Sequence, residues 1–353
     1  MMLRDRLRDL LGFFRRTERS VQQDTRDPVD HVVLLDGTMS SLDEGEETNV
    51  GLIYKILDEA AVNHRLALLY EAGNQWEDWS KTLDIIEGRG INRQIRRTYG
   101  WLASRYREGD RIFLIGFSRG AYAVRSLAGV IGEVGLLRRD QASERMVREA
   151  YRHYQENTPI ETRNAFREAY CRAETPIEMI GVFDTVKSLG FRAPFVVRWA
   201  EVKHAFHNAE LGEHVKRGFH AIALDETREA FAPVLWSCPP DHKGVVEQVW
   251  FRGSHGDVGG QLTGQYEARP LSNIPLVWMI EKLDACGLPL PANWRMRFPM
   301  DPDAIGVGNW RGWGKYFLAR KRRVIGADRS ESIHPTAIGR SPRAPETGSP
   351  VTT

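Results

Sequence analysis

Residues 111–125 read RIFLIGFSRGAYAVR, an apolar run that breaks into Gly-Phe-Ser-Arg-Gly and continues with small and apolar residues. This pattern predicts a buried strand, a tight turn centred on Ser118 and then a helix. Gly116 and Gly120 let the strand and the helix approach closely, while a strained serine backbone lifts the hydroxyl clear of the sheet. The pattern is typical of the nucleophile elbow of α/β-hydrolases. The alternative is an ordinary strand–helix turn with an exposed serine.

Short apolar runs on both sides of this elbow predict further buried strands. They cover residues 31–35, 65–70, 177–183, 218–224 and 248–251. Helical patterns lie between them, at residues 49–61, 91–107, 143–154, 162–172 and 273–283. Because strands and helices alternate, the chain is expected to form an α/β-hydrolase-like fold with a mainly parallel sheet flanked by helices. Helical insertions are expected at residues 138–174 and, as a cap over the site, at about residues 190–215.

Four of the predicted strands run into polar turns that hold Asp36, Ser118, Asp184 and His255. The carboxyl ends of parallel strands meet at one edge of a sheet, so these residues are expected to converge there. The order serine, aspartate, histidine along the chain is that of α/β-hydrolases. In such a triad Ser118 attacks the substrate, His255 takes its proton and returns it to the leaving group, and Asp184 fixes the imidazole tautomer.

Acyl transfer also needs donors for the negative oxygen that forms during the reaction. The backbone N–H of Arg119, at the start of the helix predicted after the elbow, is expected to supply one of them. The second is expected from the loop after the first strand, from Gly37 or Thr38.

The acidic residues also allow other interpretations. Asp184 can instead cap the turn after its strand, and His255 can be a structural histidine. Asp257 is a rival for the catalytic acid, although its place two residues beyond the histidine favours an anchoring role in the glycine-rich loop. A further charged group is expected to form a buried or partly buried ion network that braces the sheet: Asp225, Glu226 and Arg228.

The chain of 353 residues is 42% hydrophobic and 27% charged, and its net charge of +2 gives no reason to expect a nucleic-acid partner. Cys171, Cys238 and Cys286 lie far apart, fit no metal spacing and are expected to be buried thiols in a reducing compartment. No apolar run is long enough to cross a bilayer, and the N-terminus lacks the features of a signal peptide. A cytoplasmic protein is therefore expected, and export by a leaderless apparatus stays open.

Three segments are expected along the chain. Residues 1–27 are expected to form a basic amphipathic helix, over residues 1–20, and a linker; this helix can lie on an anionic membrane or dock on protein. Residues 28–339 are expected to form the hydrolase domain. Residues 340–353, rich in Pro, Ser, Thr and Gly, are expected to be disordered.

Six motifs occur in order over about residues 30 to 340: Leu-Leu-Asp36-Gly-Thr, Gly116-Phe-Ser-Arg-Gly-Ala-Tyr, Gly181-Val-Phe-Asp184-Thr-Val, His220-Ala-Ile-Ala-Leu-Asp225-Glu-Thr-Arg228, Val249-Trp-Phe-Arg-Gly-Ser-His255-Gly-Asp-Val-Gly-Gly and Ser332-Ile-His334-Pro. With these motifs the chain resembles the DUF2235 family, the α/β-hydrolase domain that includes the Tle1-like phospholipase effectors of type VI secretion. The resemblance implies ester hydrolysis by a triad at Ser118, Asp184 and His255, with phospholipid as the best-known substrate class. It also allows a secretion adaptor or an immunity protein as a partner.

The sequence thus predicts a serine ester hydrolase that forms an acyl-enzyme and acts on a lipid or a small ester, without a cofactor. His204 and His207 in the cap lack a third metal ligand, so a plain helix face is favoured for them. Two alternatives stay open. One is a binding or partner module that keeps the fold but has an idle site. The other, against which the elbow serine argues, is a metal-dependent phosphoester hydrolase with these ligands: Asp36, Asp184, His255 and Asp257.

Overall fold

The computed structural model describes residues 26–73, 89–186, 211–310 and 318–340. The N-terminal helix, most of the cap and the C-terminal tail that the sequence predicts lie outside these residues, as do His204 and His207. None of the described helices combines the length and the apolar composition that a bilayer-spanning segment needs.

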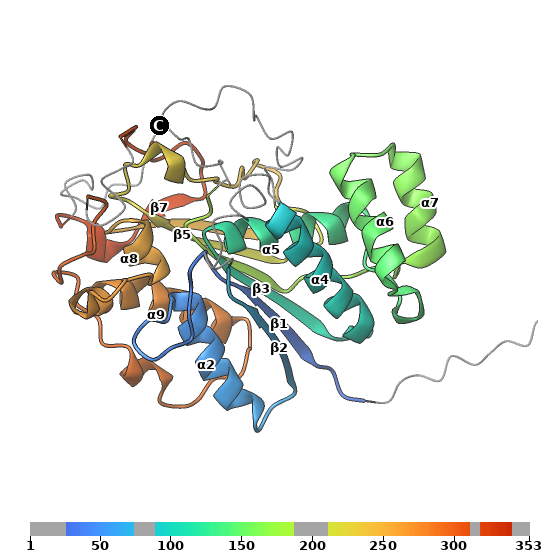
Figure 1. Ribbon diagram of the computed structural model, residues 1–353, viewed down its shortest axis with the longest axis horizontal. Helices are drawn as coiled ribbons and strands as arrows, with labels where there is room; N and C mark the ends of the chain where they lie inside the picture. The colour runs from blue at the N-terminus through green and yellow to red at the C-terminus, as the bar shows by residue number, and fades with distance from the viewer. Residues whose placement is uncertain (1–25, 74–88, 187–210, 311–317, 341–353) are drawn as a thin grey trace, which may run out of the picture.

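In the described part of the chain, seven parallel strands form one sheet with the order β2-β1-β3-β4-β5-β6-β7 (Figure 1). The strands are β1 (Asp30–Leu35), β2 (Leu66–Glu71), β3 (Arg111–Phe117), β4 (Met179–Phe183), β5 (Arg217–Ala223), β6 (Val245–Phe251) and β7 (Glu331–Ile333). Strand β2 lies on one side of β1 and β3 on the other, so the strand order reverses its direction at β1. Ligand sites of open α/β sheets lie at such points.

Helices cover both faces of this sheet (Figure 1). They are α2 (Asn49–Ala61), α4 (Arg89–Arg105), α5 (Arg119–Glu133), α6 (Glu144–Gln155), α7 (Ile160–Tyr170), α8 (His255–Gly259) and α9 (Arg269–Ala285). Side chains alternate along each strand, so every strand supplies both faces. Val33 and Leu114 belong to the apolar cluster that includes α4 and α5, while Val32 and Phe113 belong to the cluster that includes α2 and α9.

The predicted α/β-hydrolase-like fold is confirmed, with strands and helices close to their predicted bounds. The helical insertion predicted at residues 138–174 contains α6 and α7, which lie together at one side of the molecule (Figure 1). Strand β7 was not predicted, because three residues are too few to show a period along the sequence.

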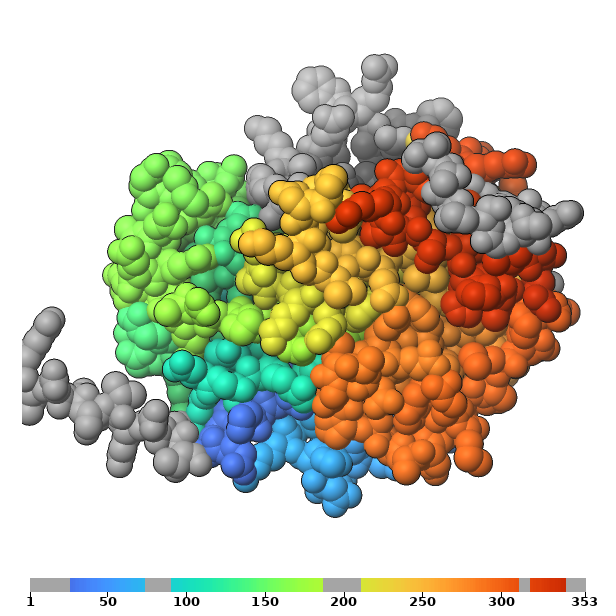
Figure 2. All heavy atoms as spheres, turned by 180° about the vertical axis from the view of Figure 1, so that it is seen from behind, coloured from blue at the N-terminus to red at the C-terminus, as the bar shows by residue number. Residues whose placement is uncertain are grey.

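Strand β7 belongs to a C-terminal segment, residues 318–340, that returns to the sheet edge after α9. Figure 2 shows this segment, coloured red, against the yellow and orange surface formed by residues from 211 onwards. The side chain of Arg329 donates to the carbonyl oxygens of Cys238 and Pro239, which ties the two segments together. The same segment reaches the carboxyl ends of β4 and β5, where Arg323 contacts Asp184 and the carbonyl oxygen of Ala223.

Candidate active site

Ser118 stands between β3 and α5 with backbone angles φ 57° and ψ −118°. Positive φ is strained for a residue with a Cβ and is held here because the glycines on both sides allow close packing. A Cβ on Gly120 would lie 2.0 Å from the carbonyl oxygen of Leu35, and one on Gly116 would lie 2.7 Å from the backbone of Ala121. The local geometry is therefore that of the predicted elbow.

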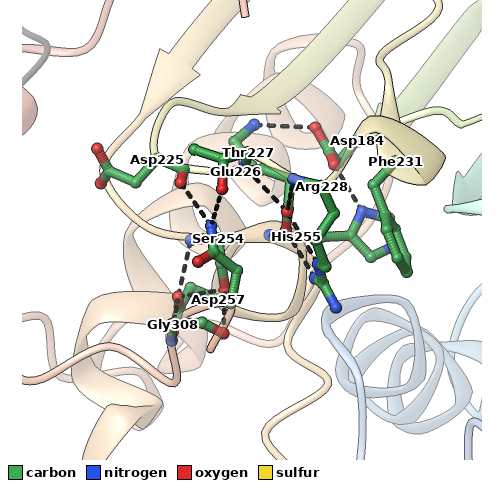
Figure 3. A network of polar contacts seen from close by, with 12 residues as sticks. Asp184, Asp225, Glu226, Thr227, Arg228, Phe231, Ser254, His255, Asp257 and Gly308 are labelled. Carbon is green, nitrogen blue, oxygen red and sulfur yellow. Dashed lines mark hydrogen bonds and ion pairs between the residues drawn. The ribbon is translucent and has the colours of Figure 1, made fainter. Parts of the chain in front are cut away.

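The structure brings Ser118, Asp184 and His255 into one chain of hydrogen bonds. His255 Nε2 lies 2.9 Å from Ser118 Oγ, and His255 Nδ1 lies 2.5 Å from Asp184 Oδ2. Asp184 follows β4 with a positive φ of 37°, and His255 is the first residue of α8. Ser118, His255 and Asp184 are 8%, 4% and 0% exposed. Figure 3 shows the carboxylate of Asp184 directed at the imidazole. The spacing suits a proton relay, and the catalytic roles stay predictions.

Two aromatic rings enclose the imidazole of His255. The ring centroids of Phe117 and Phe231 each lie 4.8 Å from that of His255. Phe231 belongs to a short 3-10 helix (Glu229–Phe231) beside the histidine (Figure 3). This apolar contact restricts ring rotation and keeps bulk water from the side of the histidine.

The carboxylate of Asp184 has a second partner that sequence reasoning missed. Arg323 Nη1 lies 2.6 Å from Asp184 Oδ1, and Arg323 Nη2 lies 2.9 Å from Asp184 Oδ2. Burial alone would raise the pKa of Asp184, but the charge of Arg323 and the hydrogen bonds from His255 and Arg323 hold it well below its usual range. Asp184 is therefore a carboxylate, able to accept from the imidazole, at any moderate pH.

The predicted network of Asp225, Glu226 and Arg228 is present in part. Glu226, fully buried, forms a two-pronged ion pair with Arg228, whose Nε and Nη2 lie 2.9 Å and 2.6 Å from its carboxylate oxygens. Glu226 also accepts from the backbone N–H of His255 at 3.2 Å, and Asp225 accepts from the N–H of Gly253 at 2.8 Å. These groups hold the histidine loop, whereas the sequence predicted that they brace the sheet. The sequence does not show that β5 ends beside that loop.

Asp257 has the anchoring role that its position favoured. Its Oδ2 accepts from the backbone N–H and the hydroxyl of Ser254, both at 2.8 Å, and its Oδ1 accepts from the N–H of Val307 at 2.6 Å. Figure 3 shows Asp257 between Ser254 and Gly308, turned away from Asp184. With its oxygens held in this way, Asp257 does not replace Asp184 as the partner of His255.

The loop after β1 lies next to the nucleophile, where the second oxyanion donor is predicted. A Cβ on Gly37 would lie 3.5 Å from Ser118 Cβ. The N–H of Gly37, however, donates to Asp36 Oδ1 at 2.7 Å. The carbonyl of Thr38 accepts from Gln261 at 2.8 Å, and no acceptor for the N–H of Thr38 is found within the described residues. Of the two predicted donors, Thr38 is therefore the better candidate, together with the N–H of Arg119 at the start of α5.

Asp36 is a buried carboxyl group at the base of this loop, 1% exposed. Its Oδ2 accepts from the hydroxyls of Thr48 and Tyr70 at 2.6 Å and 2.8 Å. Burial raises the pKa of Asp36 to about 6, although these hydrogen bonds oppose the rise. Asp36 therefore shapes the loop through Gly37 and changes its charge near pH 6.

Asp36→Asn is expected to remove a pH-dependent loss of stability. A carboxyl group whose pKa is raised by folding stabilises the protein below its unfolded pKa, near 4, and this stabilisation is lost as the pH rises through the folded value, about 6. Between pH 4 and pH 7 the wild type should lose about 2 kcal/mol of unfolding free energy relative to Asp36→Asn. Chemical denaturation at several pH values measures this difference. Asp58→Asn, at an exposed position of α2, is the control, and parallel curves for wild type and Asp36→Asn would contradict the assignment.

The four side chains predicted as ligands in the metal-dependent alternative do not form a metal site. Asp36 is held by Thr48 and Tyr70, Asp184 by Arg323, and Asp257 by its own loop. Among the residues that the structure describes, no group of three histidine, cysteine or acidic side chains is arranged to hold a metal ion. The geometry thus gives the metal-dependent alternative no support.

A hollow of about 350 Å³ lies behind the histidine loop, lined by Asp225, Asp257, Asn309 and Trp310 among others. Ser118 is not among its lining residues, so it does not hold the substrate of the elbow serine. The acyl pocket that the sequence predicts under residues 190–215 lies mainly outside the described residues.

Comparison with known proteins finds a family model that matches most of the chain. Residues 30–282 match the sequence model described as the catalytic domain of Tle1-like type VI secretion phospholipase effectors. An uncharacterised protein of Saccharomyces cerevisiae is 25% identical over 235 residues, which cover 59% of this chain and 33% of the yeast protein.

Two solved structures are similar at low identity. An uncharacterised protein from Pseudomonas aeruginosa is 15% identical with a TM-score of 0.42, over 78% of this chain and 49% of that one. The Tle1 effector, solved bound to the VgrG spike of the type VI secretion system, is 17% identical with a TM-score of 0.35, over 67% and 51% of the two chains. The present chain thus spans about a third of the yeast relative and about half of each solved chain.

Proposed function

The chain belongs to the family of Tle1-like catalytic domains of type VI secretion phospholipase effectors, and from this premise we propose that it hydrolyses carboxylic esters of phospholipids through an acyl-enzyme. The observation that carries the proposal is the unbroken contact from Ser118 Oγ through the imidazole of His255 to Asp184. Membership of an effector family also supports export by that secretion system, with its components as partners, as part of the same proposal.

In the proposed reaction Ser118 Oγ attacks the ester carbonyl carbon while His255 Nε2 takes the hydroxyl proton. The carbonyl oxygen becomes negative and is held by the backbone N–H groups of Arg119 and Thr38. As the intermediate collapses, the ester C–O bond breaks and His255 returns its proton to the leaving alcohol. Water, deprotonated by the same imidazole, then cleaves the acyl-serine ester and releases the carboxylic acid and free Ser118.

Asp184 supports both halves of this cycle. It accepts from His255 Nδ1, so Nε2 is the nitrogen left without a proton and turned to Ser118. Its negative charge stabilises the imidazolium that forms in each half-reaction. Phe117 and Phe231 hold the ring in the plane where it reaches both partners.

Labelling and hydrolysis together test the proposal. A fluorophosphonate probe should modify Ser118, located by peptide mass spectrometry, and the full chain should release fatty acid and lysophospholipid from vesicles of phosphatidylcholine and phosphatidylglycerol. Cleavage of short p-nitrophenyl esters without cleavage of vesicles would keep the serine hydrolase and remove the phospholipid assignment. Without labelling or cleavage of any ester, the chain would instead be a binding module with an idle site.

A further inference from the structure

We infer that Arg323 is a positioning residue of the catalytic site, which fixes the carboxylate of Asp184 against His255 and balances the negative charge of that carboxylate. The inference rests on the proposed function. It assigns a role in the reaction to the segment of residues 318–340, which lies beyond the matched residues 30–282.

The guanidinium of Arg323 pairs with both oxygens of the Asp184 carboxylate, including Oδ2, the oxygen that also contacts His255. Its two terminal nitrogens contact both carboxylate oxygens, at 2.6 Å and 2.9 Å. The same nitrogens donate to the carbonyl oxygens of Ala223, at 2.7 Å, and Phe231, at 2.6 Å. A planar fork with these four bonds fixes the carboxylate plane, which a lysine amine cannot do in the same way.

Through these bonds Arg323 controls two neighbours of the imidazole. Asp184 accepts from its Nδ1, and Phe231 packs on its ring at 4.8 Å. Arg323 is 6% exposed and Asp184 is fully buried, so water cannot take the place of either partner. A change in Arg323 is therefore passed to His255 through both contacts.

The charges around His255 are matched in pairs. Among the residues that the structure describes, two carboxylates interact with it: Asp184, at its Nδ1, and Glu226, at its backbone N–H. Arg323 forms the ion pair with Asp184, and Arg228 forms the ion pair with Glu226. The guanidinium of Arg228 also lies over the Phe231 ring. On its own element Asp257 is held by Ser254.

Two further titratable groups, His220 and Arg125, lie in the same buried region. His220 accepts from the N–H of Thr185, and burial lowers the pKa of His220 to about 3, so it carries no charge. Arg125 acts on His220 and donates to the carbonyl oxygens of Val234 and Leu235. Neither of these groups takes the place of Arg323 at the carboxylate.

Removal of the positive charge of Arg323 should shift the pH dependence of activity in one direction. Asp184 would face the imidazole with an uncompensated negative charge, which favours the protonated ring. Since the attack needs the unprotonated ring, activity at low pH would fall first. A residue that only stabilises the fold would lower the rate equally at every pH.

The test compares the pH profile of kcat/KM in wild type and three variants, from pH 5 to 9, on a soluble short-chain p-nitrophenyl ester. In Arg323→Met the highest value of kcat/KM, the plateau of the profile, should fall about 10- to 100-fold because the triad is misplaced. The acid limb, where kcat/KM falls as the pH decreases, should move up by about one pH unit. In Arg323→Lys the charge is kept, so the limb should stay while the plateau falls. Arg322→Met removes an exposed charge from the neighbouring position and should match the wild type in both.

An acid limb that stays in place in Arg323→Met would overturn the inference, whatever the plateau rate. If thermal unfolding shows that Arg323→Met is not folded, Arg323→Gln takes its place, because it also removes the charge but keeps an amide donor for the carboxylate. Its acid limb should move up as well, and a limb that stays in place overturns the inference. A wild type without Ser118-dependent activity would refute the proposed function instead, so the two failures are distinct.

Discussion

Ser118→Ala is expected to lower the turnover number by about 10⁴- to 10⁶-fold on any ester that the wild type cleaves. The substitution removes the atom that forms the acyl-enzyme and leaves the rest of the site in place. His255 keeps its contact with Asp184, and the backbone donors of Arg119 and Thr38 remain. The activity that is left should therefore come from binding and oxyanion stabilisation alone.

The measurement is the initial rate of ester cleavage, with folding checked by circular dichroism and thermal unfolding. Ser104→Ala is the matched control, because Ser104 is a half-buried helical serine whose hydroxyl donates to the carbonyl of Trp101, away from the site. It should retain the wild-type rate. A Ser118→Ala protein within tenfold of the wild type would show that another group is the nucleophile, and the acyl-enzyme proposal would fall.

The local signals in the sequence were sufficient for the fold and for the elbow. An apolar run followed by Gly-x-Ser-x-Gly requires a strand, a strained serine and a helix, and each of these features depends on neighbours in sequence. Asp184 and His255 were predicted in the same way, because each lies in a polar turn that follows a predicted buried strand. Parallel topology then brings Asp184 and His255 to the edge that holds Ser118.

Local sequence patterns do not show which side chains contact each other in the folded chain. Arg323 is 139 residues from Asp184, in a segment without a strong period, and nothing near it marks one arginine as the partner of the acid. The same applies to the N–H of Gly37. It was an equal candidate for the oxyanion until the structure showed the rotamer of Asp36 that accepts from it. The role of Glu226 at the histidine loop likewise depends on where β5 ends in space.

Asp184→Asn is expected to lower turnover by about 10⁴-fold, as loss of the triad acid does where geometry is kept, and also to destabilise the fold. Every described partner of this carboxylate is a donor: His255, Arg323 and the N–H of Ala223. An amide offers one NH₂ group, which must face a donor in either orientation. Because Arg323 would then be a buried cation without its counter-charge, the cost should be about 3–5 kcal/mol of unfolding free energy.

Rate and stability can be separated by the double variant Asp184→Asn with Arg323→Met. It removes the unpaired cation, so denaturant titration should recover much of the lost stability, while turnover should stay as low as in Asp184→Asn. The pKa of Asp184 is held well below its usual range, and its stabilisation is present above pH 4 and lost only as the pH falls far below that value. The stability difference between wild type and Asp184→Asn should therefore be constant from pH 5 to 8. A double variant no more stable than Asp184→Asn would mean that the cost lies in the amide contacts with His255 and Ala223, and that the Arg323 charge is compensated by other groups.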